Sequence, residues 1–151
     1  MPLTEDFWTL DGQKSFGHLP GLVLDRTDPV PICLQWGTKQ WGARHIGHKH
    51  APFITQNSVG APARHEVPWV IWKKLQQSGS IWTAEQAGKL KVSLPLSPSS
   101  LLILQLNEDD EPFFSVTTLY THSRGLDGQN IGRYVGRKWL PKVIPVFHLP
   151  P

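Results

Sequence analysis

The sequence predicts an α+β domain in which short N-terminal helices pack on a twisted antiparallel β-sheet. Three observations support this class. With 14 prolines in 151 residues, the chain is divided into short elements, which excludes a long helical bundle. Helical periodicity is limited to residues 43–50 and 69–77, in the first half of the chain. Strand patterns separated by turn residues fill residues 89–121, in the second half.

The strands expected in the first half are short. Residues 21–24 and 31–36 are apolar runs, and the turn-forming residues 25–29 separate them, which is typical of two strands. Residues 1–20 are polar and contain glycine. We therefore expect a loose N-terminal arm over residues 1–20 and a single domain over residues 21–151.

Two helices are expected before the main sheet. Residues 43–50 can form two or three helical turns that end near Pro52, because proline cannot continue a helix. Residues 69–77 repeat an apolar side chain at every third position, and the following Gly79 ends this helix.

Three strands are expected in the second half. Residues 89–94 and 112–121 alternate apolar and polar side chains, and residues 100–106 form a continuous apolar run. Residues 107–110, an asparagine followed by three acidic residues, lie between the last two strands and predict a hairpin turn.

Composition limits the function only broadly. The net charge is +3, and 7 histidines can add positive charge below about pH 6.5. A mildly basic domain suits a polyanionic partner, but the charge alone does not identify one. Cys33 is the single cysteine, so an intramolecular disulfide and a thiolate zinc cluster are both excluded. Cys33 lies in an apolar run, which predicts a small buried hydrophobic residue.

The chain shows neither an apolar stretch of the roughly 20 residues that span a bilayer nor the basic-then-apolar order of a signal peptide. We expect no membrane partner and a cytoplasmic site of action. If the domain is exported, we expect it to be delivered as part of a larger exported protein.

The densest group of functional side chains lies within residues 44–50. It contains three histidines and two cations in seven residues: Arg44, His45, His48, Lys49 and His50. On a helix, His45 and Lys49 would share a face, which suits general acid–base catalysis beside a cation that stabilises phosphoryl charge. A histidine-ligated metal site is an alternative, although no cysteine or acidic ligand follows closely. The other alternative is a solvated basic helix.

A second group lies on the strand expected over residues 112–121. Val116, Thr118 and Tyr120 should share one face, and Thr117 and Thr121 the other. Hydroxyls opposite a histidine helix could hold a phosphate or orient a ribose 2′-hydroxyl. The alternative is that threonine and tyrosine are here because strands favour them.

A third group, near the C-terminus, interleaves cations with aromatic side chains. Arg133, Arg137 and Lys138 alternate with Tyr134 and Trp139. Such a segment can bind backbone phosphates and stack on bases, or it can be a solvated surface with two anchoring rings.

The order of these motifs resembles the toxin ribonucleases of the barnase–EndoU–colicin–RelE superfamily, particularly the branch found in phage proteins and in contact-dependent inhibition toxins. In that branch, a helix with an HI..KH-like motif precedes a sheet whose late strand carries a V.T.Y-like motif. Here the corresponding residues are His45, Ile46, Lys49 and His50, followed by Val116, Thr118 and Tyr120. The resemblance covers about residues 30 to 122.

The resemblance implies a concave RNA-binding face and metal-independent cleavage that leaves a cyclic phosphate, with no cofactor. By position, His45 would be the general base or acid, His50 its partner, and Lys49 the stabiliser of phosphate charge. Thr118 and Tyr120 would position or protonate groups at the scissile bond. The additional His48 leaves the choice of histidine open, and the doubled threonine leaves the strand register open, since a one-residue slip exchanges the faces.

The expected partners are RNA, for example tRNA, and a cognate immunity or antitoxin protein. The expected substrate-binding residues are Arg44, His48, Arg133, Arg137 and Lys138. Two other functions remain open: a non-catalytic module that binds RNA or protein, such as a phage accessory protein, and a metal-dependent hydrolase that uses His45, His48 and His50.

Overall fold

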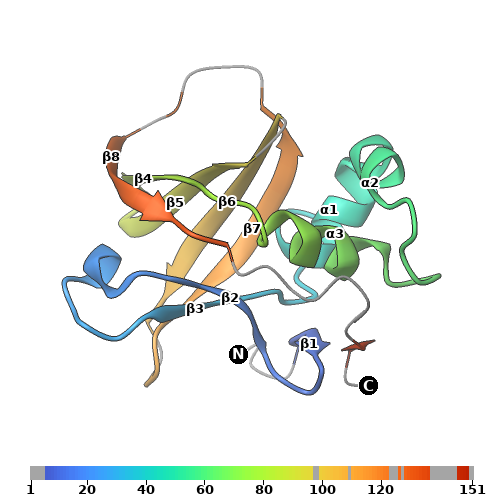
Figure 1. The fold of residues 1–151 in the computed structure, drawn as a ribbon, viewed down its shortest axis with the longest axis horizontal. Helices are drawn as coiled ribbons and strands as arrows, with labels where there is room; N and C mark the ends of the chain where they lie inside the picture. Colours follow the sequence, from blue (N-terminus) through green and yellow to red (C-terminus); the bar gives the residue numbers. More distant parts are fainter. Residues whose placement is uncertain are drawn as a thin grey trace.

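The structure of the chain is a computed structural model that describes residues 6–96, 99–108, 110–122, 126, 128–136 and 146–149. Its centre is a seven-stranded sheet with the strand order β2-β3-β7-β6-β5-β4-β8 (Figure 1). The strands are β2 (Ser15–Leu19), β3 (Val30–Cys33), β4 (Gly79–Gln86), β5 (Lys89–Leu96), β6 (Ser100–Asn107), β7 (Phe113–Thr121) and β8 (Gln129–Tyr134). A separate two-stranded sheet pairs β1 (Thr9–Leu10) with β9 (Phe147–His148).

Three helices lie together beside β7: α1 (Gly42–Lys49), α2 (Ala51–Asn57) and α3 (Glu66–Lys74) (Figure 1). Pro52 stands in the first turn of α2, where a backbone N–H has no partner within the helix and its absence costs nothing. Because proline has no N–H to donate, α1 cannot continue through this position. The chain therefore changes direction at His50, between α1 and α2. The predicted α+β class, with short helices on a twisted sheet, is confirmed.

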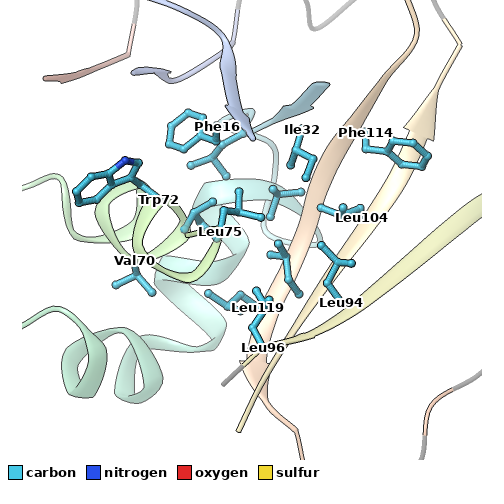
Figure 2. Packing of buried hydrophobic residues seen from close by; sticks show 14 of the residues in the cluster. Phe16, Ile32, Val70, Trp72, Leu75, Leu94, Leu96, Leu104, Phe114 and Leu119 are labelled. Carbon is cyan, nitrogen blue, oxygen red and sulfur yellow. The ribbon is translucent and has the colours of Figure 1, made fainter. Parts of the chain in front are cut away.

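The core fills the space between the helices and the concave side of the sheet. Leu75, at the end of α3, lies on the side of the strands that carry Leu94, Leu104 and Leu119, whereas Val70 and Trp72 are buried on the other sides of the helix (Figure 2). Leu104 and Leu119 are fully buried. Removing such side chains from water, at about 25 cal/mol per Å² of apolar surface, is the main force that holds helices and sheet together.

Several boundaries differ from the predicted ones. Residues 6–20 are not a loose arm: Phe16 and Leu19 of β2 are buried, and β2 pairs with β3. Residues 21–24 form a 3₁₀ helix instead of a strand. The sheet is mixed, because β3 and β7 pair in parallel while the other pairs described are antiparallel. Strand β4 had no predicted counterpart, since its side chains are mostly half-buried and show little alternation.

An irregularity in β7 decides which threonine faces the helix. Ile103 pairs with Thr118 but the next residue of β6, Leu104, pairs with Val116, so Thr117 is the extra residue of a β-bulge. Cross-strand partners point to the same face of the sheet. In β6, Leu102 and Leu104 point to one face and Ile103 to the other, so their partners in β7 divide in the same way. Val116 therefore shares a face with Leu119 rather than with Thr118 and Tyr120, as simple alternation would have it.

Candidate active site at the junction of α1 and β7

The start of α1 is tied to both strands that precede and adjoin it. The Ala43 N–H donates to the Gln35 carbonyl at 2.9 Å, and the Arg44 N–H donates to the Trp36 carbonyl at 2.8 Å. The buried Ser115 hydroxyl of β7 donates to Gln35 Oε1 at 2.8 Å. Residue 35 thus connects the helix to β7, which fixes the position of α1 along that strand.

A tight loop over residues 37–41 leads into α1. Gly37 and Gly42 both have positive φ, at 74° and 85°, and a Cβ atom on Gly37 would lie 2.2 Å from the Trp41 carbonyl oxygen. Only glycine fits this approach without a shift of the backbone. The Thr38 N–H donates to the Trp41 carbonyl at 2.9 Å. The loop is therefore closed by its own backbone, and it places the carbonyl of Lys39 above the helix.

His45 lies between this loop and β7. Its Nδ1 is 2.8 Å from the Lys39 carbonyl oxygen, and its Nε2 is 3.1 Å from Thr118 Oγ1. A carbonyl oxygen can only accept, so Nδ1 carries the proton and donates it. In the neutral ring, Nε2 is then the acceptor for the Thr118 hydroxyl. Residues 73 positions apart are joined by this bond, and the imidazole is held in one tautomer.

His50 and Tyr120 complete the cluster. The His50 ring meets the His45 ring edge-on, with centroids 5.2 Å apart and an interplanar angle of 82°. On its other side it stacks on the Tyr120 ring, with centroids 5.6 Å apart and an angle of 26°. Burial lowers the pKa of His50, and the nearby charges of His45 and Lys49 lower it further. His50 is therefore neutral near pH 7 and able to accept a proton.

Helical geometry divides the basic run of residues 44–50 into two groups. Lys49 is one turn beyond His45, and its charge reaches His50. Arg44 and His48 are also one turn apart, and both line a groove next to the cluster. The structure thus brings together His45, Lys49, His50, Thr118 and Tyr120, while His48 lines the neighbouring groove with Arg44.

Arg133 and Tyr134, the described residues of the third predicted group, do not join this site. Arg133 is exposed on β8, which β6, β5 and β4 separate from β7, a span of four strand spacings or roughly 19 Å along the sheet (Figure 1). Arg133 therefore does not adjoin the histidines, and its role in substrate binding stays a prediction. Arg137 and Lys138 lie outside the described residues.

Neither a metal site nor a reactive thiol is found in the part of the chain that the structure describes. No group of three or more His, Cys, Asp or Glu side chains there could hold a metal ion. Burial raises the pKa of Cys33 to about 12, so its thiol stays protonated, and the prediction of a small buried hydrophobic residue is confirmed.

Two parts of the site were missed in the sequence. The Lys39 carbonyl orients His45, and a main-chain atom leaves no mark in a side-chain pattern. The exposed ring of Trp36 stands beside the same loop. The pair of glycines at positions 37 and 42 is the one signal in the sequence that could have indicated a tight loop before the helix.

Comparison with protein-family models, with curated proteins and with solved structures found no match. Among the described residues, no helix has the length and apolar character that crossing a membrane requires.

Proposed function

We propose that this chain is a metal-independent endoribonuclease in which His50 and His45 transfer protons at a phosphodiester bond. The observation that carries the proposal is the convergence of two imidazoles from α1 and its end with two hydroxyls from β7. One imidazole is fixed by hydrogen bonds at both nitrogens, and the other has a lowered pKa. Two imidazoles in reach of one phosphodiester can serve as the base and the acid of such a reaction.

In the proposed reaction, neutral His50 takes the proton of a ribose 2′-hydroxyl. The 2′-oxygen then attacks the adjacent phosphorus, and the bond from phosphorus to the 5′-oxygen of the next nucleotide breaks. His45, protonated at both nitrogens, gives the Nε2 proton to this leaving oxygen. The products are a 2′,3′-cyclic phosphate and a free 5′-hydroxyl, and the catalyst regains its starting state when a proton passes from His50 back to His45 through water.

The neighbouring side chains have supporting roles in this scheme. The Lys39 carbonyl accepts from Nδ1, which leaves Nε2 as the atom of His45 that exchanges a proton with the leaving oxygen. Thr118 orients Nε2 towards the strand, and Tyr120 holds the plane of the His50 ring. Lys49, one turn from His45, stabilises negative charge that develops on the phosphoryl oxygens.

The test is cleavage of RNA by the purified chain in excess chelator, with the termini of the products identified by mass spectrometry. We expect cyclic phosphate and 5′-hydroxyl ends. As a control, a matched strand with a single 2′-deoxyribose at the cleaved position should stay intact, because it lacks the nucleophile. Cleavage of the deoxy-substituted strand, or activity that depends on added metal, would contradict the proposal and favour a metal-dependent hydrolase.

The same proposal includes a toxic action on RNA, for example tRNA, and a protective partner. A ribonuclease active in cytoplasm endangers the cell that makes it, and the cations beside the site would attract an acidic inhibitor protein. Tightly induced expression of the wild-type chain in bacteria should stop growth, while expression of His45→Ala should not. Vigorous growth with soluble, folded wild-type protein would favour a non-catalytic binding module.

A further inference from the structure

A groove of about 570 Å³ lies beside the histidine cluster, between the loop before α1, the exposed side of α1 and the start of α3. This volume falls within the range of roughly 300–1,000 Å³ that small-molecule sites occupy. Part of its lining is apolar and comes from residues such as Trp8, Val67 and Pro68. The rest is polar and mostly basic.

The charge of the groove favours an anion. Lys39, Arg44 and Arg64 contribute three cations to its lining, His48 adds an imidazole, and Glu66 is the acidic residue opposite them. Lys39 and Arg44 are exposed, so their charged groups can reach a ligand in solvent. An arginine can bind two phosphate oxygens at once, which fixes a phosphate in orientation as well as in position.

Trp36 gives the same groove an aromatic surface. Its side chain is 39% exposed, although tryptophan rings are usually covered. Its backbone is held from both sides: its N–H donates to the Asp6 carbonyl at 2.7 Å, and its carbonyl accepts from Arg44 at 2.8 Å. An exposed ring on a fixed backbone is a prepared stacking surface, because little conformational freedom is lost when a flat ligand covers it.

We infer that this groove binds one unpaired nucleotide of the RNA strand, with its base stacked on Trp36 and its phosphate held by Arg44 and Lys39. A base must leave the helical stack to enter a pocket and stack on a side chain, so the ligand is a single-stranded segment.

The place of the bound nucleotide along the RNA strand rests on the proposed ribonuclease activity. Lys39 lines the groove with its side chain and contacts His45 with its carbonyl, and Arg44 precedes His45 in α1. The nucleotide bound there therefore lies next to the scissile phosphodiester. Binding itself does not require cleavage, and the two can be measured separately.

The experiment measures binding of a short oligoribonucleotide whose 2′-hydroxyls are replaced by fluorine, which removes the nucleophile. Trp36→Ala should weaken binding about tenfold or more, the usual effect of losing one stacked base, and Trp36→Phe should recover most of it. Arg44→Gln should lower the slope of log affinity against log salt by about 0.7, as expected for the loss of one phosphate contact with a single strand.

Two matched variants serve as controls. Leu22→Ala removes another exposed apolar side chain, 53% exposed on the 3₁₀ helix, and Lys89→Gln removes another exposed cation, at the turn between β4 and β5. Both should bind as the wild type does. Circular dichroism of every variant establishes that it is folded before its affinity is compared.

The outcomes separate the groove from the catalytic proposal. If the wild type cleaves RNA but Trp36→Ala binds like the wild type, the groove inference is wrong and the proposed function stands. If binding depends on Trp36 but no RNA is cleaved, the proposed function fails and the groove inference stands. Equal binding of a duplex of the same sequence, or equal losses in the two control variants, would also overturn the inference.

Discussion

The two tyrosines of the chain stand on different strands of the same sheet, β8 at its edge and β7 in its interior, and do different things. Tyr134 of β8 is fully buried, and its hydroxyl donates to the Leu75 carbonyl at the end of α3. Burial raises its pKa, which keeps the hydroxyl protonated and structural. Tyr120 of β7 is half-buried, and its ring stacks on His50 at the surface. One tyrosine closes the core, and the other belongs to a cluster that solvent can reach.

The difference shows what makes a site out of basic and aromatic residues. Around β8, Arg133 is exposed beside a tyrosine whose polar atom is already used inside the protein. At the α1–β7 junction, the polar groups are fixed by contacts between distant parts of the chain and remain partly open. Similar residue types in the sequence thus give a structural anchor at the edge strand β8 and a prepared cluster at β7.

The largest effect is expected from His45→Ala. Removing a general acid–base group lowers turnover by about 10²- to 10⁴-fold. The matched variant is His148→Ala, which removes an exposed histidine on β9 and should cleave RNA at nearly the wild-type rate. Steady-state cleavage of one RNA by the three proteins measures the effect, and near-normal turnover by His45→Ala would remove this residue from the mechanism.

The next effect compares two adjacent threonines. A hydrogen bond to a charged group contributes about 1.5–3 kcal/mol, so Thr118→Val should lower kcat about 10- to 150-fold by releasing His45 Nε2. Thr118→Ser should restore most of the rate, because it keeps the hydroxyl. Thr117→Val should act like the wild type, since Thr117 is the extra residue of the bulge. If the Thr117 variant is the impaired one, the register of β7 is wrong.

A stability measurement separates the two tyrosines. Tyr134→Phe removes the donor to the buried Leu75 carbonyl, which should lower the free energy of unfolding by about 1–3 kcal/mol. Tyr120→Phe removes a hydroxyl from a half-buried ring and should change stability by less than about 0.5 kcal/mol. Urea denaturation gives both values. Equal losses of stability in the two variants would mean that the hydroxyls of Tyr134 and Tyr120 do not differ as described.

The smallest effect is a change in the pKa of His50, measured by NMR titration. Burial and the charges of His45 and Lys49 lower this pKa, so Lys49→Met should raise it, while Lys89→Met, at the distant β4–β5 turn, should leave it unchanged. An unchanged pKa in Lys49→Met would contradict the placement of Lys49.

The sign of the associated pH dependence follows from the same shift. The unfolded chain takes up the His50 proton near the ordinary pKa of about 6.5, and the folded chain does so at lower pH. The contribution of His50 to stability is therefore complete above about pH 6.5 and declines as the pH falls towards the lowered pKa. The proposed activity should decline over the same range, because protonated His50 cannot act as the base.

The central strands and the helices α1 and α3 could be predicted because their signals are local, whereas α2 was not predicted. The apolar run of residues 100–106 and the hairpin that follows it became β6 and β7, and the three-residue spacing from Trp69 marked α3. The edges of the fold could not be predicted in this way. Residues 6–20 look polar in sequence, yet their few apolar side chains, such as Phe16, are buried by contacts with residues far along the chain.

For the candidate site, the sequence indicated which residues belong to it but not which of them contact one another. His45, Thr118 and Tyr120 were identified from motif order, and they do meet. The contact of His45 with His50, and the place of His48 in the neighbouring groove, depend on how α1 is turned relative to β7, which no local pattern contains. The bulge at Thr117 likewise depends on the pairing of β7 with β6, so period-two alternation placed Val116 on the wrong face.

The pairing of β1 with β9, the first and last strands among the described residues, makes the molecule mechanically asymmetric. Thr9 pairs with His148 and Leu10 with Phe147 in antiparallel register, so tension from the C-terminal side peels β9 away one pair at a time, like a zipper. Tension from the N-terminal side is carried first by the bonds from Trp36 to the Asp6 carbonyl and from Trp8 to the Leu34 carbonyl. Those bonds support the segment that leads into the loop behind His45. Tension on the C-terminal side thus separates β9 from β1, while tension on the N-terminal side acts on the backbone bonds that support the loop beside His45.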